Sequence, residues 1–217
     1  HVFYSLPEGL LVILERTGWW LHLLVIYGFI LYLPYSKHLH VFLAFPNSYF
    51  SNLNPRGRIS NIPVIENEAR GMLGLAQNDQ IESVESFGAK DIFDLDWRTL
   101  LAAYSCTECG RCTSVCPANL TGKKLSPRKI VMDIRDRLEE VGQNYKSNKS
   151  ANNAVFDDGK SLFDYISKEE IYACTTCNAC VEACPVLINP MDPIIQLRRY
   201  DILMNSGGPS EWLPMFN

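Results

Sequence analysis

The sequence predicts a mainly α-helical chain in which one transmembrane helix precedes a helical domain. Three observations lead to this prediction. The first is a run of twenty residues without Lys, Arg, Asp or Glu, from Thr17 to Ser36. The second is a pair of cysteine quartets with the same spacing in the later half of the chain. The third is the helical pattern of the residues around and between those quartets.

The cysteine quartets carry the most specific signal. Each reads C-x2-C-x2-C-x3-C-P, which is the spacing of ferredoxins with two [4Fe-4S] clusters. In such pairs three cysteines hold one cluster, and the fourth, before proline, ligates the other. The predicted ligands of one cluster are Cys106, Cys109, Cys112 and Cys184, and those of the other are Cys174, Cys177, Cys180 and Cys116.

Other uses of these cysteines fit the pattern less well. Disulfide scaffolds belong to small secreted domains, whereas this chain has 217 residues. Zinc sites usually show paired C-x2-C knuckles without a third cysteine at the same step. Because iron-sulfur clusters are kept in reducing compartments, we expect this half of the chain on the cytoplasmic side of a membrane.

The uncharged run is long enough to be a membrane span. Twenty residues at about 1.5 Å each cover a hydrocarbon core of roughly 30 Å. Trp19 and Trp20 at one end, with Tyr32 and Tyr35 toward the other, resemble the aromatic belts of such spans. A buried core helix is the alternative, and a signal peptide fits poorly because no small-residue cleavage site is present.

Positive charges give the orientation of this predicted span. Arg16 precedes it, and three basic residues follow it: Lys37, Arg56 and Arg58. By the positive-inside rule the downstream side is cytoplasmic, in agreement with the cysteines. We therefore expect a protein of the cell (inner) membrane with its cluster domain in the cytoplasm.

Two histidines in the membrane segment are candidate haem ligands. On one continuous helix, His22 and His40 would be five whole turns apart and share a face, whereas His38 would point to nearly the opposite side. One histidine per leaflet suits the axial ligation of two b haems, with the partner ligands on other helices. His40 as an interfacial residue, and a bend at Pro34 that spoils the register, are the alternatives.

The domain plan has four regions. We expect a membrane segment at 1–45, a mostly irregular linker at 46–95, a helical ferredoxin domain at 96–205 and a tail at 206–217. Within the domain, helices are predicted at 97–105, 127–142, 168–173 and 193–204, with Gly142 ending the second and a surface loop at 143–160. Fifty-seven residues separate Cys116 from Cys174, which favours an all-α domain over a compact βαβ ferredoxin.

The cysteine half resembles the helical ferredoxin domain of the heterodisulfide-reductase family, and is also similar to those of the anaerobic glycerol-3-phosphate dehydrogenase and fumarate reductase iron-sulfur subunits. The segment from WWLHLL to SKHLH resembles the end of a nitrate-reductase-gamma-like or heterodisulfide-reductase-E-like b-type cytochrome. The resemblance covers residues 17 to about 205 and implies a cytochrome fused to a ferredoxin. This sequence departs from the pattern of those families in two ways. Such cytochromes have several spans, so we expect more of them before His1, and the cysteine-rich CCG domains of the family are absent from this sequence.

The predicted function is electron transfer. A membrane-bound subunit would pass electrons between a quinone and haem b module and a soluble redox partner through two [4Fe-4S] clusters. The resemblance implies a quinone such as menaquinone, two haems b, membrane lipid and the remaining cytochrome helices as partners. The soluble partner would be a CCG-domain protein, an electron-transfer flavoprotein or a respiratory complex subunit.

Two alternatives stay open, and the enzyme class is left undecided. The ferredoxin domain could be tethered by a simple anchor without haem or quinone, or the clusters could serve only to hold the fold together. The sequence shows no nucleophile with a base, no phosphate loop and no nucleotide fingerprint, so any substrate chemistry is expected on another polypeptide or domain. The formal net charge of −4 gives no indication of nucleic-acid binding.

Overall fold

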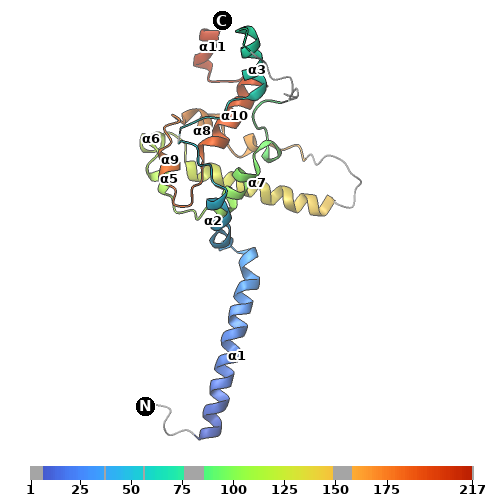
Figure 1. Cartoon of the computed structure of the whole chain (residues 1–217), viewed down its shortest axis with the longest axis vertical. Helices are drawn as coiled ribbons and strands as arrows, with labels where there is room; N and C mark the ends of the chain where they lie inside the picture. Colours follow the sequence, from blue (N-terminus) through green and yellow to red (C-terminus); the bar gives the residue numbers. More distant parts are fainter. Residues whose placement is uncertain (1–6, 37, 56, 76–85, 149–157, 217) are drawn as a thin grey trace. The chain divides into compact units, whose positions relative to one another are not determined.

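The chain is described here from a computed structural model, which covers residues 7–36, 38–55, 57–75, 86–148 and 158–216. Lys37 and Arg56, used above for orientation, lie outside these residues, as does part of the predicted loop at 143–160. Every regular element of the described residues is a helix, which confirms the predicted mainly α fold (Figure 1). The chain divides into two compact units, His1–Phe42 and Leu43–Asn217.

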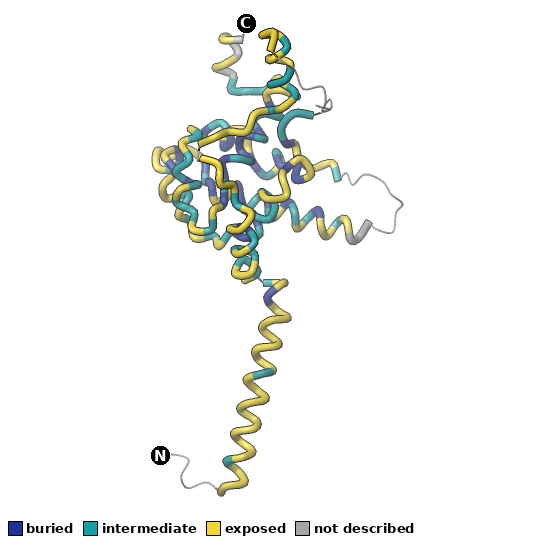
Figure 2. The backbone as a smooth tube through the Cα atoms, in the orientation of Figure 1, coloured by how far each residue is buried: buried dark blue, intermediate teal, exposed yellow. Residues whose placement is uncertain are grey.

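The first unit contains one long helix, α1 (Glu8–Tyr32). At about 1.5 Å per residue its 25 residues extend for roughly 37 Å, enough to cross a bilayer core. None of its residues is buried, as Figure 2 shows along its whole length. Among the described residues, Glu8–Tyr35 is the one stretch long and apolar enough to be a membrane span. Such a large exposed apolar surface indicates association with a membrane.

Pro34 ends the continuous helix that the histidine argument assumed. It stands at the start of a short 3-10 helix, η1 (Leu33–Tyr35), and α2 (Leu39–Tyr49) follows as a separate helix. Proline has no backbone N–H to donate to a helix, and two residues after Pro34 the chain becomes extended at Ser36, with φ −117° and ψ 164°. His22 and His40 therefore stand on different helices, and the predicted five-turn register between them is wrong. The rings of His38 and His40 are 6.4 Å apart, which corrects the expectation that they point to opposite sides.

The second unit contains the remaining helices, most of them short. In chain order they are α3 (Pro63–Met72), η2 (Ile92–Asp94), α4 (Trp97–Ser105), α5 (Arg111–Ser114), α6 (Pro117–Leu120), α7 (Pro127–Asn148), η3 (Leu162–Asp164), α8 (Lys168–Ala173), α9 (Ala179–Glu182), α10 (Met191–Leu203), η4 (Ser210–Trp212) and α11 (Leu213–Phe216). The predicted helices 97–105 and 168–173 are confirmed, and the closing helix begins two residues earlier than predicted.

One local prediction, the end of the helix at Gly142, is wrong. α7 continues through Gly142 to Asn148, so part of the predicted surface loop is helical. Gly142 does not take the left-handed conformation that ends many helices, and the buried face of α7 extends as far as its neighbour Val141. The predicted linker at 46–95 contains helix α3, which begins at Pro63, and the short η2, which Asp91 caps, while most of its other described residues lie outside helices.

The core of the second unit forms around α7 and α10. Ile130 and Ile134 of α7 are at most 1% exposed, and Ile194 and Leu197 of α10 are fully buried. Ile171 of α8 joins the same apolar cluster. The buried stripe on α7 is the one its 3.6-residue periodicity predicts. This core holds the short helices that carry the cysteines.

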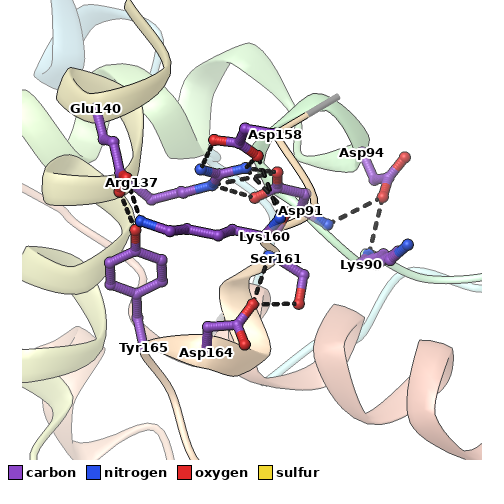
Figure 3. A network of polar contacts seen from close by, with 10 residues as sticks. All are labelled: Lys90, Asp91, Asp94, Arg137, Glu140, Asp158, Lys160, Ser161, Asp164 and Tyr165. Atoms are coloured by element: carbon purple, nitrogen blue, oxygen red, sulfur yellow. Dashed lines mark hydrogen bonds and ion pairs between the residues drawn. The ribbon is translucent and has the colours of Figure 1, made fainter. Parts of the chain in front are cut away.

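A buried arginine anchors two separate segments to α7 (Figure 3). Arg137 has 1% of its side chain exposed and pairs with Asp91 at 2.7 Å and Asp158 at 2.6 Å. Its Nη2 also donates to the backbone carbonyl of Lys160 at 2.9 Å. The hydrogen bond from Arg137 holds the pKa of Asp158 well below its usual range. Because an unpaired buried charge is costly, this pairing fixes both segments against α7.

Candidate iron-sulfur centre

The two cysteine motifs begin with the same backbone geometry. Cys106 directly follows α4 with φ −69° and ψ 124°, and Cys174 directly follows α8 with φ −69° and ψ 125°. Both helices therefore end abruptly at the first cysteine, and the extended conformation there turns the chain into the loop of the motif. The second unit thus presents the same loop twice.

The repeat continues through the loops. Two residues after the first cysteine, Glu108 and Thr176 have φ values of 56° and 54°. Two residues further on, Gly110 and Asn178 have φ values of 79° and 62° and start α5 and α9. Left-handed backbone favours glycine or asparagine, so these residue types explain how each loop turns tightly around its cysteines.

The repeat also extends upstream of the cysteines, which the sequence reasoning missed. The 3-10 helix η2 precedes α4 and begins with a capping box between Asp91 and Asp94. η3 precedes α8 and begins with an equivalent capping box between Ser161 and Asp164. The sequences DIFD at 91–94 and SLFD at 161–164 carry this signal, and could have shown that the repeat is longer than the cysteine motif.

The structure gathers the eight cysteines around two cavities. The first cavity is lined by Cys106, Cys109, Cys112 and Cys184. The second is lined by Cys174, Cys177, Cys180 and Cys116. Each cavity thus receives three cysteines from one motif and the last cysteine of the other, because the short helices α5 and α9 pack against each other. This is the same division that the spacing predicts.

The chemistry of these thiols suits an iron-sulfur cluster. Burial raises the pKa of Cys106, Cys112 and Cys174, and raises that of Cys180 to about 12. Such thiols hold protons unless a cation compensates the thiolate, which cluster iron would do. No group of three or more His, Cys, Asp or Glu side chains within the described ranges is placed to hold a single metal ion.

Backbone amides lie close to several sulfurs. The N–H of Thr176 donates to Sγ of Cys174, and the N–H of Ile188 donates to Sγ of Cys184, each at 3.4 Å. The N–H of Arg111 lowers the pKa of Cys109, the opposite direction from the buried thiols. Amide hydrogen bonds to cluster sulfurs are a main means by which proteins set the reduction potential.

Residues far from the motifs hold the first cavity in place. The hydroxyl of the buried Ser105, next to Cys106, donates to the carbonyl of Leu43 at 3.0 Å. The side chain of Asn47 donates to the carbonyl of Val186 at 2.7 Å, just after Cys184. Nothing in the sequence marks these residues, because each depends on a partner far along the chain.

The second motif is held in place by side-chain contacts with helix α10. Arg198 of α10 donates to the carbonyls of Ile171 and Cys174, in each case at 2.5 Å for Nη2. A cation at this position satisfies carbonyls that the end of α8 leaves unpaired. Tyr172 donates to the buried Asp201 at 2.9 Å. α10 therefore fixes the last turn before Cys174.

The histidines and Arg111 are placed as follows. His22 is exposed on α1, and His40 is partly buried at the start of α2. Arg111, which the sequence marks within CGRC, is exposed on α5 and borders the first cavity.

Comparison with known protein families identifies the cysteine region. Residues 105–188 match the 4Fe-4S dicluster domain. The chain contains a dicluster domain. No solved structure matches the chain.

Several curated proteins are similar over longer stretches. The probable iron-sulfur-binding oxidoreductase FadF of Bacillus subtilis is 36% identical over 212 residues, 86% of this chain and 28% of the relative. The EtfAB:quinone oxidoreductase of Syntrophomonas wolfei is 29% identical over 225 residues, 96% of this chain and 29% of the relative. The chain therefore spans less than a third of these two relatives, which are iron-sulfur oxidoreductases or quinone oxidoreductases by name.

Two further relatives bear on the membrane and on the suggested family. A probable membrane-anchored ferredoxin of Chromohalobacter salexigens is 32% identical over 151 residues, 64% of this chain and 22% of the relative. One subunit of the ferredoxin:CoB-CoM heterodisulfide reductase of Methanosarcina mazei is 31% identical over 100 residues, 46% of each chain. The resemblance to heterodisulfide-reductase iron-sulfur proteins is thus supported for the cysteine half, while the fused cytochrome remains a prediction.

Proposed function

We propose that this chain is an electron-transfer subunit that carries two [4Fe-4S] clusters. The first cluster is assigned to Cys106, Cys109, Cys112 and Cys184, and the second to Cys174, Cys177, Cys180 and Cys116. The observation that carries this proposal is that two cavities, each lined by four cysteines, lie side by side in a matching dicluster domain. When bound, such clusters supply one-electron transfer.

The chain's own residues prepare both cavities for that role. The left-handed turns at Gly110 and Asn178 let each loop turn between its second and third cysteines, and the backbone amides beside Cys174 and Cys184 are placed to stabilise sulfur charge. Apolar side chains such as Val131 at the first cavity and Ile194 at the second exclude water. Burial of this kind is one of the factors that set cluster potential.

In the larger assembly, electrons would pass between a membrane quinone such as menaquinone, two haems b, the two clusters and a soluble redox partner. His22 and His40 are the proposed axial ligands of the haems, and each would need a partner histidine on another helix. The name of the quinone oxidoreductase relative supports a quinone connection, and α1 supports the membrane setting. The cluster domain would face the cytoplasm, with an electron-transfer flavoprotein, a CCG-domain protein or a respiratory subunit as its partner.

A specific observation favours a second candidate function. A relative is named a membrane-anchored ferredoxin, and His22 and His40 stand on separate helices rather than on one face. In this alternative α1 is a simple anchor, and the chain binds neither haem nor quinone.

The spectrum of the protein in detergent separates these functions. We expect the dithionite-reduced minus oxidised spectrum to show a broad iron-sulfur bleach together with sharp b-type bands, and His22→Ala to remove one set of bands. Haem extraction from the same sample provides the control. Bleach without b-type bands would leave the anchored ferredoxin as the function, and absence of both iron and bleach would refute the electron-transfer proposal itself.

A further inference from the structure

The two cysteine loops reach the surface in different surroundings. In each motif the second cysteine, Cys109 or Cys177, is the exposed one. Electron transfer falls steeply with distance, so an exposed ligand is the natural point at which a cluster exchanges electrons with another protein. The domain thus has two candidate ports, one at each loop.

The port at Cys109 is positively charged. Arg111 and Arg128 both border the first cavity, and both side chains are exposed. Within the described part of the chain, neither guanidinium takes part in an ion pair. The nearby Glu108 is paired with Arg135 at 2.8 Å, so it does not cancel the two arginines.

The position of these arginines is fixed by the fold. Arg111 is the first residue of α5, and Arg128 lies in the first turn of α7. The hydroxyl of Thr113 joins the two helices, because it bonds the Ser126 hydroxyl at 2.9 Å and accepts from the N–H of Arg128 at 3.3 Å. The fold therefore brings both arginines to the border of the same cavity.

The cavity at Cys177 has no charged residue in its lining, and its loop is partly screened. The residues that line the second cavity besides its cysteines are Leu125, Pro127, Thr175, Thr176, Asn178, Met191 and Ile194, none of which is charged. The chain at Gly57 passes beside this loop, where an added Cβ would be 3.4 Å from Nδ2 of Asn178. Arg198 contacts the second motif by donating to the backbone carbonyl of Cys174, and it is not among the residues that line the cavity.

We propose that the loop at Cys109 is the docking site of the soluble redox partner, and that the partner presents an acidic surface to Arg111 and Arg128. Complementary charge accelerates association and orients the partner over the exposed ligand. The loop at Cys177 is then left to exchange electrons within the complex. This inference rests on the proposed function, because it requires clusters at both loops.

The test uses the full chain in detergent, loaded with clusters and reduced. Oxidation is followed in a stopped-flow instrument with hexacyanoferrate(III), an anionic oxidant, and with hexaammineruthenium(III), a cationic one. Each oxidant takes one electron from the protein and is reduced to its iron(II) or ruthenium(II) form. The ratio of the two rates cancels any change in cluster potential, because a changed driving force affects both oxidants.

The variants place the same change of charge at each port. Arg111→Gln and Arg128→Gln each remove one positive charge at the first loop, and Thr175→Glu adds one negative charge at the second. At low ionic strength we expect each arginine variant to lower the anion-to-cation rate ratio by roughly threefold to tenfold. We expect Thr175→Glu to change it by less than about twofold, and high salt to remove the differences.

Each other outcome counts against the inference in a recognisable way. An unchanged ratio in both arginine variants of a cluster-loaded protein would refute the docking site alone. If Thr175→Glu lowered the anion-to-cation rate ratio as much as Arg111→Gln does, the first loop would not be the preferred site of electron exchange, and the proposal would be wrong. A protein that binds no iron would refute the proposed function and the docking site together.

Discussion

The two cysteine motifs share a backbone and differ in what surrounds them. Their first cysteines have the same dihedral angles, and their loops turn at the same two positions. Yet the first is bordered by exposed arginines and held by α2, whereas the second has an uncharged cavity lining and is held by Arg198 of α10. Local sequence therefore sets the ligand geometry, and tertiary contacts set charge and support, which are the properties that can differ between two clusters.

The largest expected effect tests whether the motifs exchange their fourth cysteines. Cys184→Ala should remove the cluster of the first motif, although the substitution lies in the second. We expect half of the iron and sulfide to be lost, with the magnetic coupling between clusters replaced by the EPR signal of a single reduced cluster. Cys116→Ala is the matched variant and should remove the other cluster. If Cys184→Ala instead left the potential and signal of the first cluster intact, the two motifs would be independent.

A smaller effect is expected where the motifs share one anchor. Arg137 pairs with Asp91 ahead of the first motif and Asp158 ahead of the second. Arg137→Met leaves two carboxylates without their buried partner, so we expect a loss of about 3–5 kcal/mol in the free energy of unfolding. Urea titration followed by circular dichroism measures it.

The control for that variant is an exposed pair of the same kind. Arg70 of α3 pairs with Glu66 at 3.2 Å on the surface. Arg70→Met should cost less than about 1 kcal/mol. Similar losses in Arg137→Met and Arg70→Met would mean that the buried anchor does not support the two motifs.

The smallest effect sharpens the comparison at one equivalent position. Tyr104 and Tyr172 each lie two residues before the first cysteine of a motif, but only Tyr172 donates to a buried carboxylate, that of Asp201. We expect Tyr172→Phe to lower the free energy of unfolding by about 1–2 kcal/mol. Tyr104→Phe should change it by less than about 0.5 kcal/mol. Equal effects in thermal or urea unfolding would show that the two supports are equivalent after all.

The sequence predicted those features that depend on local spacing. Cysteine spacing alone separated the eight thiols into the two sets that the structure gathers, and capping residues located α4 and α8 while capping and periodicity together located α7. It misplaced the helix end at Pro34 and the end of α7. At each place a residue that disfavours helix, proline or glycine, competes with the packing of the helix beyond it, and the sequence does not show which effect is larger. It could not identify Asn47, whose importance depends on Val186, 139 residues away. It could not pair Arg137 with Asp91 for the same reason.

The exchange of cysteines between the cavities has a consequence for how the protein matures. A ribosome makes the first motif well before the second, but the first cavity lacks a wall until Cys184 has been synthesised. The second cavity likewise needs Cys180, although its Cys116 has been available since much earlier. Iron delivered during translation would find no complete site at either place. We therefore expect both clusters to be inserted after synthesis of the domain, so that a chain truncated between the motifs matures neither.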